Sequence, residues 1–281
     1  MSSGNDLRSV DTHFAFGDNW REYSEKIDEA TIVQAEIGLL KLISPEQLQG
    51  ARFLDIGCGS GLHSLAASRL GAGEIVALDI DPVSVSTTRK VLADAAVAAT
   101  VREMSIFAPE IADLGQFDIV YSWGVLHHTG DMWTAIRRAA TLVRPGGLFV
   151  IAIYHKTRLC GAWKVEKRAY SRAPKVLQAA ARGIYVAALA VRMFLAGANP
   201  VRYIREYSKS RGMNFYNDVH DWLGGYPYES AAPTEIEEAM RNEGFAIHAS
   251  FPSREGIGMG LFGTGCSEYV LVRPSAPVSG V

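Results

Sequence analysis

The sequence contains little cysteine. Its 281 residues include three cysteines, Cys58, Cys160 and Cys266, and no two of them form a CxxC pair. Structural zinc sites and disulfide frameworks depend on cysteines at short, paired spacings. We therefore expect neither feature, and we expect free thiols in a reducing, cytoplasmic setting.

Long apolar runs are also lacking. Residues 1–12 are polar and have no apolar core of the kind found in signal peptides. No uninterrupted apolar run reaches the roughly 20 residues of a membrane-spanning helix, so we expect no transmembrane span. With 48% hydrophobic and 21% charged residues, the chain has enough apolar side chains to fill a globular core.

Charge is distributed unevenly. The formal net charge is −2, but residues 155–211 hold thirteen Lys and Arg against two acids. That segment therefore carries +11 and the remainder carries −13. Such a block places a positive field on one part of an otherwise acidic surface.

Short apolar strands alternate with helical segments along the first half of the chain. This alternation predicts right-handed βαβ units and a mostly parallel, doubly wound α/β sheet. The predicted strands are 52–56, 74–78, 99–104, 117–121 and 148–153, with helices at 62–70, 81–91 and 132–143. A capping box at Thr234-x-x-Glu237 then opens a last helix, and 245–251 and 268–272 close the sheet.

Residues 155–232 interrupt this alternation between the fifth strand and the last helix. We interpret them as a basic, mainly helical insert that forms a substrate lid. Residues 1–48 are predicted to be a helical segment over the cofactor cleft. The remaining residues, 49–154 and 233–275, form the predicted nucleotide-binding core.

The strongest motif is Asp55-Ile-Gly57-Cys-Gly59-Ser-Gly61, which lies between a strand and a helix. Glycines let the backbone approach a ligand, and a helix N-terminus offers free N–H groups. Asp79 ends the next strand, where a carboxylate can bind both hydroxyls of a ribose. A nicotinamide fingerprint would need glycine at the position of Leu62, which argues against that cofactor.

Two further stretches strengthen a family resemblance. Together with 53–61 and Asp79, the stretches 122–128 and 142–147 resemble the class I S-adenosylmethionine (SAM)-dependent methyltransferases. The likeness is to their small-molecule branch, the quinone and natural-product methylases. It implies a Rossmann-like, seven-stranded sheet with an antiparallel last strand, SAM as cofactor and S-adenosylhomocysteine as product.

The resemblance also implies which residues bind SAM. The glycine-rich loop would contact its methionine part and Asp79 its ribose, while the next loops flank the adenine and the sulfonium. Many relatives carry Asp where this chain has Ser105, so the adenine amino group is expected to have a neutral partner here. The implied cofactor residues are Asp55, Gly57, Gly59, Asp79, Ile80, Ser105, Ile106, Ser122, Trp123 and Trp20; for Trp20, packing against the sheet is the alternative.

Methyl transfer is an in-line displacement, and a hydroxyl acceptor gains from a general base nearby. His127 and His128 follow the fourth strand and are candidates, with helix capping or core packing as the alternative. His220 and Asp221 are candidates in the acid- and aromatic-rich segment 211–229, which could instead be an ordered hinge. A metal held by Asp218, His220 and Asp221 is not expected, because methyl transfer needs none. Candidate substrate residues are Tyr154, Arg211, Asp218, Tyr226, Tyr228 and Glu229.

Residues 176–195 are apolar nearly all round, and basic residues surround them. Burial as a lid or as a homodimer face is the favoured interpretation. The alternative is a helix that lies on an anionic membrane surface or receives a lipid-like substrate.

Together these features predict methylation of a small molecule, most readily at oxygen. The positive insert suits an anionic or phosphate-bearing acceptor. An RNA or protein methyltransferase is one alternative, although no RNA-binding module is visible and we expect no nucleic-acid partner. A non-catalytic SAM-binding scaffold is another.

Overall fold

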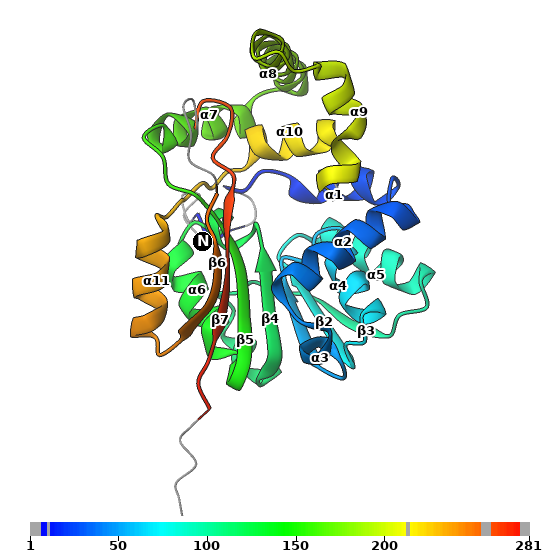
Figure 1. Cartoon of the computed structure of the whole chain (residues 1–281), viewed down its shortest axis with the longest axis vertical. Helices are drawn as coiled ribbons and strands as arrows, with labels where there is room; N and C mark the ends of the chain where they lie inside the picture. The colour runs from blue at the N-terminus through cyan, green and yellow to red at the C-terminus, as the bar shows by residue number, and fades with distance from the viewer. Residues whose placement is uncertain (1–6, 10–11, 212–213, 254–259, 276–281) are drawn as a thin grey trace, which may run out of the picture.

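A seven-stranded sheet forms the centre of the molecule in the computed structural model (Figure 1). The structure describes residues 7–9, 12–211, 214–253 and 260–275, without the side chains of 208–211. The strand order is β3-β2-β1-β4-β5-β7-β6. The strands are β1 Arg52–Ile56, β2 Glu74–Asp79, β3 Ala99–Glu103, β4 Phe117–Trp123, β5 Val143–Tyr154, β6 Ala246–Phe251 and β7 Cys266–Val272.

Strands β1 to β5 pair in parallel, and β7 runs antiparallel to both β5 and β6. The predicted mostly parallel sheet with an antiparallel last strand is therefore confirmed. Because β1, β2 and β4 are parallel neighbours, the loops that follow them meet at one edge of the sheet.

Helices cover both faces of this sheet. On one face, α2 (Glu29–Leu42), α3 (Pro45–Leu48) and α4 (Leu62–Arg69) contribute Leu39, Leu48 and Ala66 to a buried apolar cluster. A second buried apolar cluster lies on the other face. It receives side chains from α6 (Met132–Thr141), α11 (Pro233–Asn242) and the 3-10 turn Pro109–Leu114. Ile136 of α6 and Ile236 of α11 are buried in it. Packing on both faces therefore fixes the edge of the sheet from which these loops extend.

The N-terminal helix α1 (Phe16–Ser24) packs against α5 (Pro82–Asp94). Asp81 caps α5 by accepting a hydrogen bond from Val83 N at 2.8 Å, and its other oxygen accepts one from Gly17 N at 3.0 Å. A Cβ at residue 17 would lie 2.5 Å from this carboxylate, so glycine permits the contact. The bond fixes α1 beside the carboxyl edge of the sheet.

The insert is a separate helical layer over that edge (Figure 1). It contains α7 (Cys160–Arg172), α8 (Lys175–Leu195), α9 (Pro200–Arg211) and α10 (Phe215–Gly224). These helices share a small core of their own with the N-terminal segment. Its buried members are Phe14, Tyr170, Tyr207, Phe215, Val219 and Leu223.

Two sequence interpretations need correction. The last helix begins at Pro233, and Glu235 rather than Glu237 reaches back to the cap, accepting a hydrogen bond from Ala232 N at 2.7 Å. Segment 211–229, interpreted as a loop or hinge, contains α10, which Asn214 caps. No residue of α8 is fully buried in the single chain, and Ala181, Tyr185, Val186 and Leu189 pack partly buried against the core of the insert. The role of α8 as a lid or as a homodimer face stays a prediction.

Candidate active site

The glycine-rich loop joins β1 to α4 with backbone angles that glycine tolerates best. Gly57, Gly59 and Gly61 have φ values of +78°, +53° and +79°. Leu78 O, near the end of β2, accepts hydrogen bonds from Gly57 N at 2.7 Å and from Cys58 N at 3.0 Å. The loop is therefore fixed against the neighbouring strand.

Asp79 joins this loop to the start of α5. Its carboxylate accepts hydrogen bonds from Gly59 N at 3.0 Å and from Asp81 N at 2.9 Å. Burial outweighs these bonds and raises the pKa of Asp79 to about 6. A half-buried carboxylate thus stands at the carboxyl end of β2, the position predicted for a ribose ligand.

Two side chains cover the loop. A Cβ on Gly59 would lie 3.2 Å from the Trp20 indole, and one on Gly57 would lie 2.4 Å from Val125. Glycine is therefore needed for these close approaches as well as for the backbone angles. Trp20 from α1 lies over the predicted cofactor loop, and it also contacts the apolar cluster on that face of the sheet.

Asp55 is part of the loop's support. Its side chain is buried and accepts a hydrogen bond from Ser64 Oγ at 2.7 Å. Burial raises the pKa of Asp55 to about 7. The carboxylate therefore ties the end of β1 to α4.

The remaining predicted cofactor residues follow β2, β3 and β4. Ser122 Oγ donates to Ile56 O at 3.0 Å, and Trp123 Nε1 donates to Glu268 Oε1 at 3.0 Å. Both side chains are thus engaged with neighbouring strands. After β2 and β3, Ile80 and Ser105 are partly buried and Ile106 is buried.

The two histidines after β4 are buried and differ in their partners. His127 Nδ1 accepts a hydrogen bond from Tyr154 N at 3.4 Å, so the proton of the neutral ring is on Nε2, which has no partner among the described residues. His128 Nδ1 donates to Pro227 O at 2.7 Å and holds the end of the insert. Burial lowers the pKa of His128 to about 3 and that of His127 well below the usual value.

An aromatic cluster lies beyond the carboxyl end of β5. The Tyr154 ring is 3.9 Å from the His127 ring, 5.3 Å from Trp222 and 5.5 Å from Tyr228, measured between centroids. Lys167 of α7, which the sequence interpretation treated only as one of many basic residues, lies 3.7 Å from the Trp222 centroid. The cluster therefore combines residues from β5, α7, α10 and the segment after α10.

Asp221 borders this cluster. Its Oδ1 has no hydrogen-bond partner among the described residues, and burial raises the pKa of Asp221 to about 7. The two other residues of α10 that the sequence singled out, His220 and Asp218, form hydrogen bonds within the insert. His220 Nδ1 accepts from Tyr170 Oη at 2.7 Å and from Arg182 at 3.0 Å, and Asp218 accepts from Tyr207 Oη.

The other predicted substrate residues lie around the same layer. Glu229 Oε2 accepts from Met132 N at 2.9 Å and caps α6. Tyr226 is buried, and its carbonyl accepts from Phe14 N at 2.9 Å. The side chain of Arg211 lies outside the described residues. Within the described part of the chain, no three His, Cys, Asp or Glu residues gather into a possible metal site.

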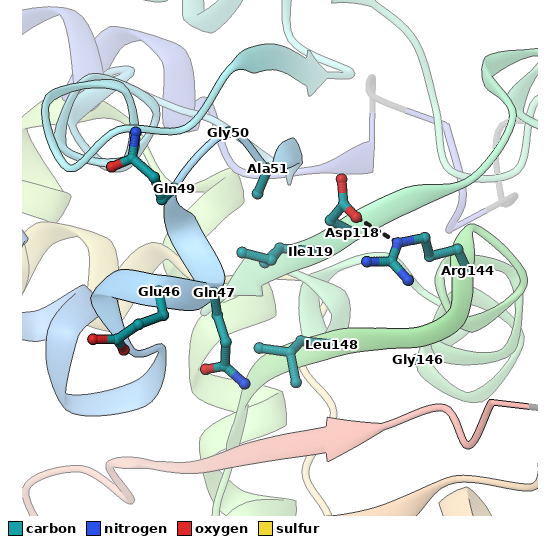
Figure 2. A pocket seen from close by; sticks show the side chains of 10 residues that line it. All are labelled: Glu46, Gln47, Gln49, Gly50, Ala51, Asp118, Ile119, Arg144, Gly146 and Leu148. Carbon is teal, nitrogen blue, oxygen red and sulfur yellow. Dashed lines mark hydrogen bonds and ion pairs between the residues drawn. The ribbon is translucent and has the colours of Figure 1, made fainter.

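A polar hollow also opens at the opposite edge of the sheet, near the amino ends of β1, β4 and β5 (Figure 2). Asp118 pairs there with Arg144 and accepts a hydrogen bond from Arg52 N at 2.7 Å. The glycine-rich loop follows the carboxyl end of β1, and Asp79 lies at the carboxyl end of β2. This hollow at the amino ends is therefore not part of the candidate site.

Comparisons with known proteins agree with this geometry. Residues 54–151 match the model of a methyltransferase domain family. A ubiquinone biosynthesis O-methyltransferase of Methylobacterium sp. (strain 4-46) is 36% identical over 115 residues, which are 41% of this chain and 45% of that protein. Its counterpart in Xanthomonas campestris pv. campestris (strain B100) is 36% identical over 110 residues, 39% of this chain and 46% of that protein. The chain thus matches less than half the length of these relatives.

Solved structures share the fold at low identity. A magnesium protoporphyrin IX methyltransferase from Synechocystis PCC 6803 with bound SAM aligns over 97% of this chain and 99% of its own, with a TM-score of 0.54 and 14% identity. The [4+2]-cyclase SpnF aligns over 86% of this chain and 81% of its own, with a TM-score of 0.52 and 13% identity. A cyclase on the same fold means that the fold alone does not fix the reaction. Residues 54–151 therefore match a methyltransferase domain in sequence, and the chain shares its fold with these solved structures.

Proposed function

We propose that the protein transfers a methyl group from SAM to an oxygen atom of a small-molecule acceptor. The observation that carries this proposal is the Asp79 carboxylate, bonded to Gly59 N beside a glycine-rich loop. The sequence match over 54–151 and the O-methyltransferase names of the relatives support the same chemistry.

The residues present fit SAM. Gly57 and Gly59 place backbone without side chains between a strand and a helix, and Asp79 offers carboxylate oxygens to ribose hydroxyls. Ile80 and Ile106 supply apolar surface for an adenine, and Trp20 covers the loop. When bound, SAM supplies an activated methyl group on a sulfonium.

The chain's own task is then to orient the acceptor and to remove its proton. Asp221 fits the role of base, because its Oδ1 has no hydrogen-bond partner among the described residues and burial raises its pKa to about 7. His127 fits a different role. Since its Nδ1 accepts a hydrogen bond, its Nε2 donates, and it would hold an acceptor oxygen rather than deprotonate it.

Exclusion of water completes the proposed mechanism. The insert helices α7 and α10 lie over the carboxyl edge of the sheet (Figure 1). Tyr154, Trp163, Trp222 and Tyr228 supply apolar walls there. A dry, aromatic site strengthens each polar contact made to the acceptor.

The insert also has a surface suited to an anionic membrane. The outer stripe of α8 exposes Leu177, Ile184, Val191, Phe194 and Leu195 at 59–79%. The helix contains no acidic residue. By length and composition α8 could even cross a membrane, but Lys175, Arg182 and Arg192 along it favour a helix lying at the surface. We therefore propose peripheral contact with anionic lipid, through which a lipid-like acceptor could reach the site.

Methyl transfer is tested with the full-length protein, SAM and a panel of phenols and catechols, with S-adenosylhomocysteine and the methylated acceptor quantified by mass spectrometry. The proposal predicts equal amounts of the two products, both lost in Asp79→Asn. S-adenosylhomocysteine binding without any methylated oxygen in the panel would contradict O-methylation of this acceptor class. An Asp94→Asn variant, altered at an exposed site at the end of α5, is the matched control.

A further inference from the structure

Lys167 of α7 is fully buried, and its charged end is unpaired. Its side chain has 0% exposure, and Nζ has no hydrogen-bond partner among the described residues. No described acid forms an ion pair with it. Lysines are almost never fully buried without a partner, because burial removes the hydration of the ammonium group.

Aromatic rings enclose this ammonium group. Nζ lies 3.7 Å from the Trp222 centroid, 5.3 Å from Tyr228, 5.8 Å from Trp163 and 5.9 Å from Tyr154. Ring faces attract a cation, but they supply no hydrogen-bond acceptor for its three N–H groups. The rings therefore position Lys167 without satisfying it.

Other buried polar atoms around the same rings also lack partners in the described chain. They are His127 Nε2, Asp221 Oδ1 and Trp222 Nε1. His127 and Trp222 both contact the Tyr154 ring, which ends β5. Buried unsatisfied groups are rare in native proteins, and several at one place indicate a ligand-binding site.

The neighbouring acids do not provide the missing partner. Glu166, on the same helix, and Asp221, on α10, are the carboxyl groups that act on Lys167. Burial raises the pKa of both acids and lowers that of Lys167. The ionised forms of all three are thus disfavoured in the empty cluster, and an added anion would favour the charged form of the lysine.

We propose that Lys167 is the anion-binding residue of the acceptor site, and that the acceptor is a planar aromatic acid whose carboxylate binds Nζ. This inference rests on the proposed function. A flat ring stacks on Tyr154 and Trp222, and a carboxylate accepts the N–H groups that the protein leaves unpaired.

The test is calorimetric titration of the full-length protein after saturation by S-adenosylhomocysteine. The titrated ligands are 4-hydroxybenzoate, 3,4-dihydroxybenzoate and the methyl ester of each. The wild type is expected to bind at least one acid ten-fold or more tightly than its ester. Lys167→Met should abolish this preference. The matched control is Lys164→Met, which removes an exposed charge one turn earlier on α7 and should retain the preference.

Thermal unfolding supplies an independent measurement. Removing an unpaired buried ammonium group should leave the melting temperature of Lys167→Met equal to or above that of the wild type, whereas a structural lysine would lower it. Equal binding of acids and esters by the wild type, or an unchanged preference in Lys167→Met, would overturn the inference. Saturation with S-adenosylhomocysteine is measured first, so failure of the cofactor proposal is distinguished from failure of this one.

Discussion

The carboxylate of Asp79 accepts a hydrogen bond from the backbone N–H of Gly59 at 3.0 Å, so the end of β2 is bonded to the glycine-rich loop that follows β1. The second Asp79 oxygen accepts a hydrogen bond from the backbone N–H of Asp81, the residue that caps α5. One side chain thereby sets the relative position of the two loops that would hold the two ends of SAM.

Replacement of Gly59 by alanine should damage both stability and cofactor binding. The residue has a φ of +53°, and an added Cβ would lie 3.2 Å from Trp20. We expect a loss of about 1–2 kcal/mol in the free energy of unfolding, measured with urea. S-adenosylhomocysteine affinity should fall in parallel.

Gly38→Ala is the control for that prediction. Gly38 lies inside α2, and no atom lies within 4 Å of an added Cβ. This change should stabilise the protein by about 0.5–1 kcal/mol because alanine favours helix. A Gly59→Ala variant as stable as wild type, with full cofactor affinity, would contradict the structure of the loop.

The pH dependence of methyl transfer should follow Asp221. Burial raises the pKa of Asp221 to about 7, and a base acts in its ionised form, so the rate should rise as pH increases through about 7 and level off above it. His127 and His128 remain neutral over this range because burial lowers their pKa values. Asp221→Asn should lower kcat by roughly 10²–10⁴-fold and remove the inflection.

The control variant is Asp113→Asn, at an exposed position of the 3-10 turn Pro109–Leu114. It should keep the pH dependence of the wild-type rate. A wild-type rate that is flat between pH 6 and 8, or an Asp221→Asn enzyme with an unchanged inflection, would eliminate Asp221 as the base.

Glu229 is expected to support α6 rather than to contact the acceptor. Its carboxylate accepts from Met132 N at the first turn of α6, where negative charge is favourable. Glu229→Gln should lower the free energy of unfolding by about 0.5–1 kcal/mol, by chemical denaturation, with the acceptor KM unchanged. Glu238→Gln, exposed on α11, should change neither quantity. A rise in the acceptor KM without a loss of stability would contradict this assignment and would indicate that Glu229 contacts the acceptor.

Membrane contact should depend on the outer stripe of α8. We expect sedimentation with phosphatidylglycerol vesicles but not with phosphatidylcholine vesicles, and weaker binding as salt is added. A Phe194→Ser, Leu195→Ser double variant should lose this binding, since both side chains are more than 70% exposed. Ile37→Ser alters an exposed apolar residue on α2 and should have no effect; equal losses in both variants would contradict the assignment to α8.

The sheet could be predicted because its signals are local. Strands such as Glu74–Asp79 are short apolar runs, and the glycine-rich loop and Asp79 identify the edge where a ligand would bind. The fifth strand was predicted to begin at Leu148 but begins at Val143, which pairs with Phe117 across a register shift. An irregular pairing of this kind depends on the neighbouring strand, so the sequence of β5 alone does not reveal it.

The acceptor site could be predicted only in part because its parts meet through tertiary packing. Lys167 is one of thirteen basic residues in the insert, and nothing in its local sequence distinguishes it from Lys164. Its burial arises when α10 packs against α7 and brings Trp222 onto the ammonium group. The helical spacing of Phe215, Val219 and Leu223 was not recognised, because acids, aromatics and glycines around these residues obscured it, and the segment was interpreted as a loop or hinge.

Calorimetric titration with SAM and with S-adenosylhomocysteine, on wild type, Asp79→Asn and the control Asp94→Asn, tests the central claim most directly. The account predicts micromolar binding of both ligands by the wild type and the control, and a loss of about 100-fold or more in Asp79→Asn. Absence of binding by the wild type, or full affinity in Asp79→Asn, would contradict it.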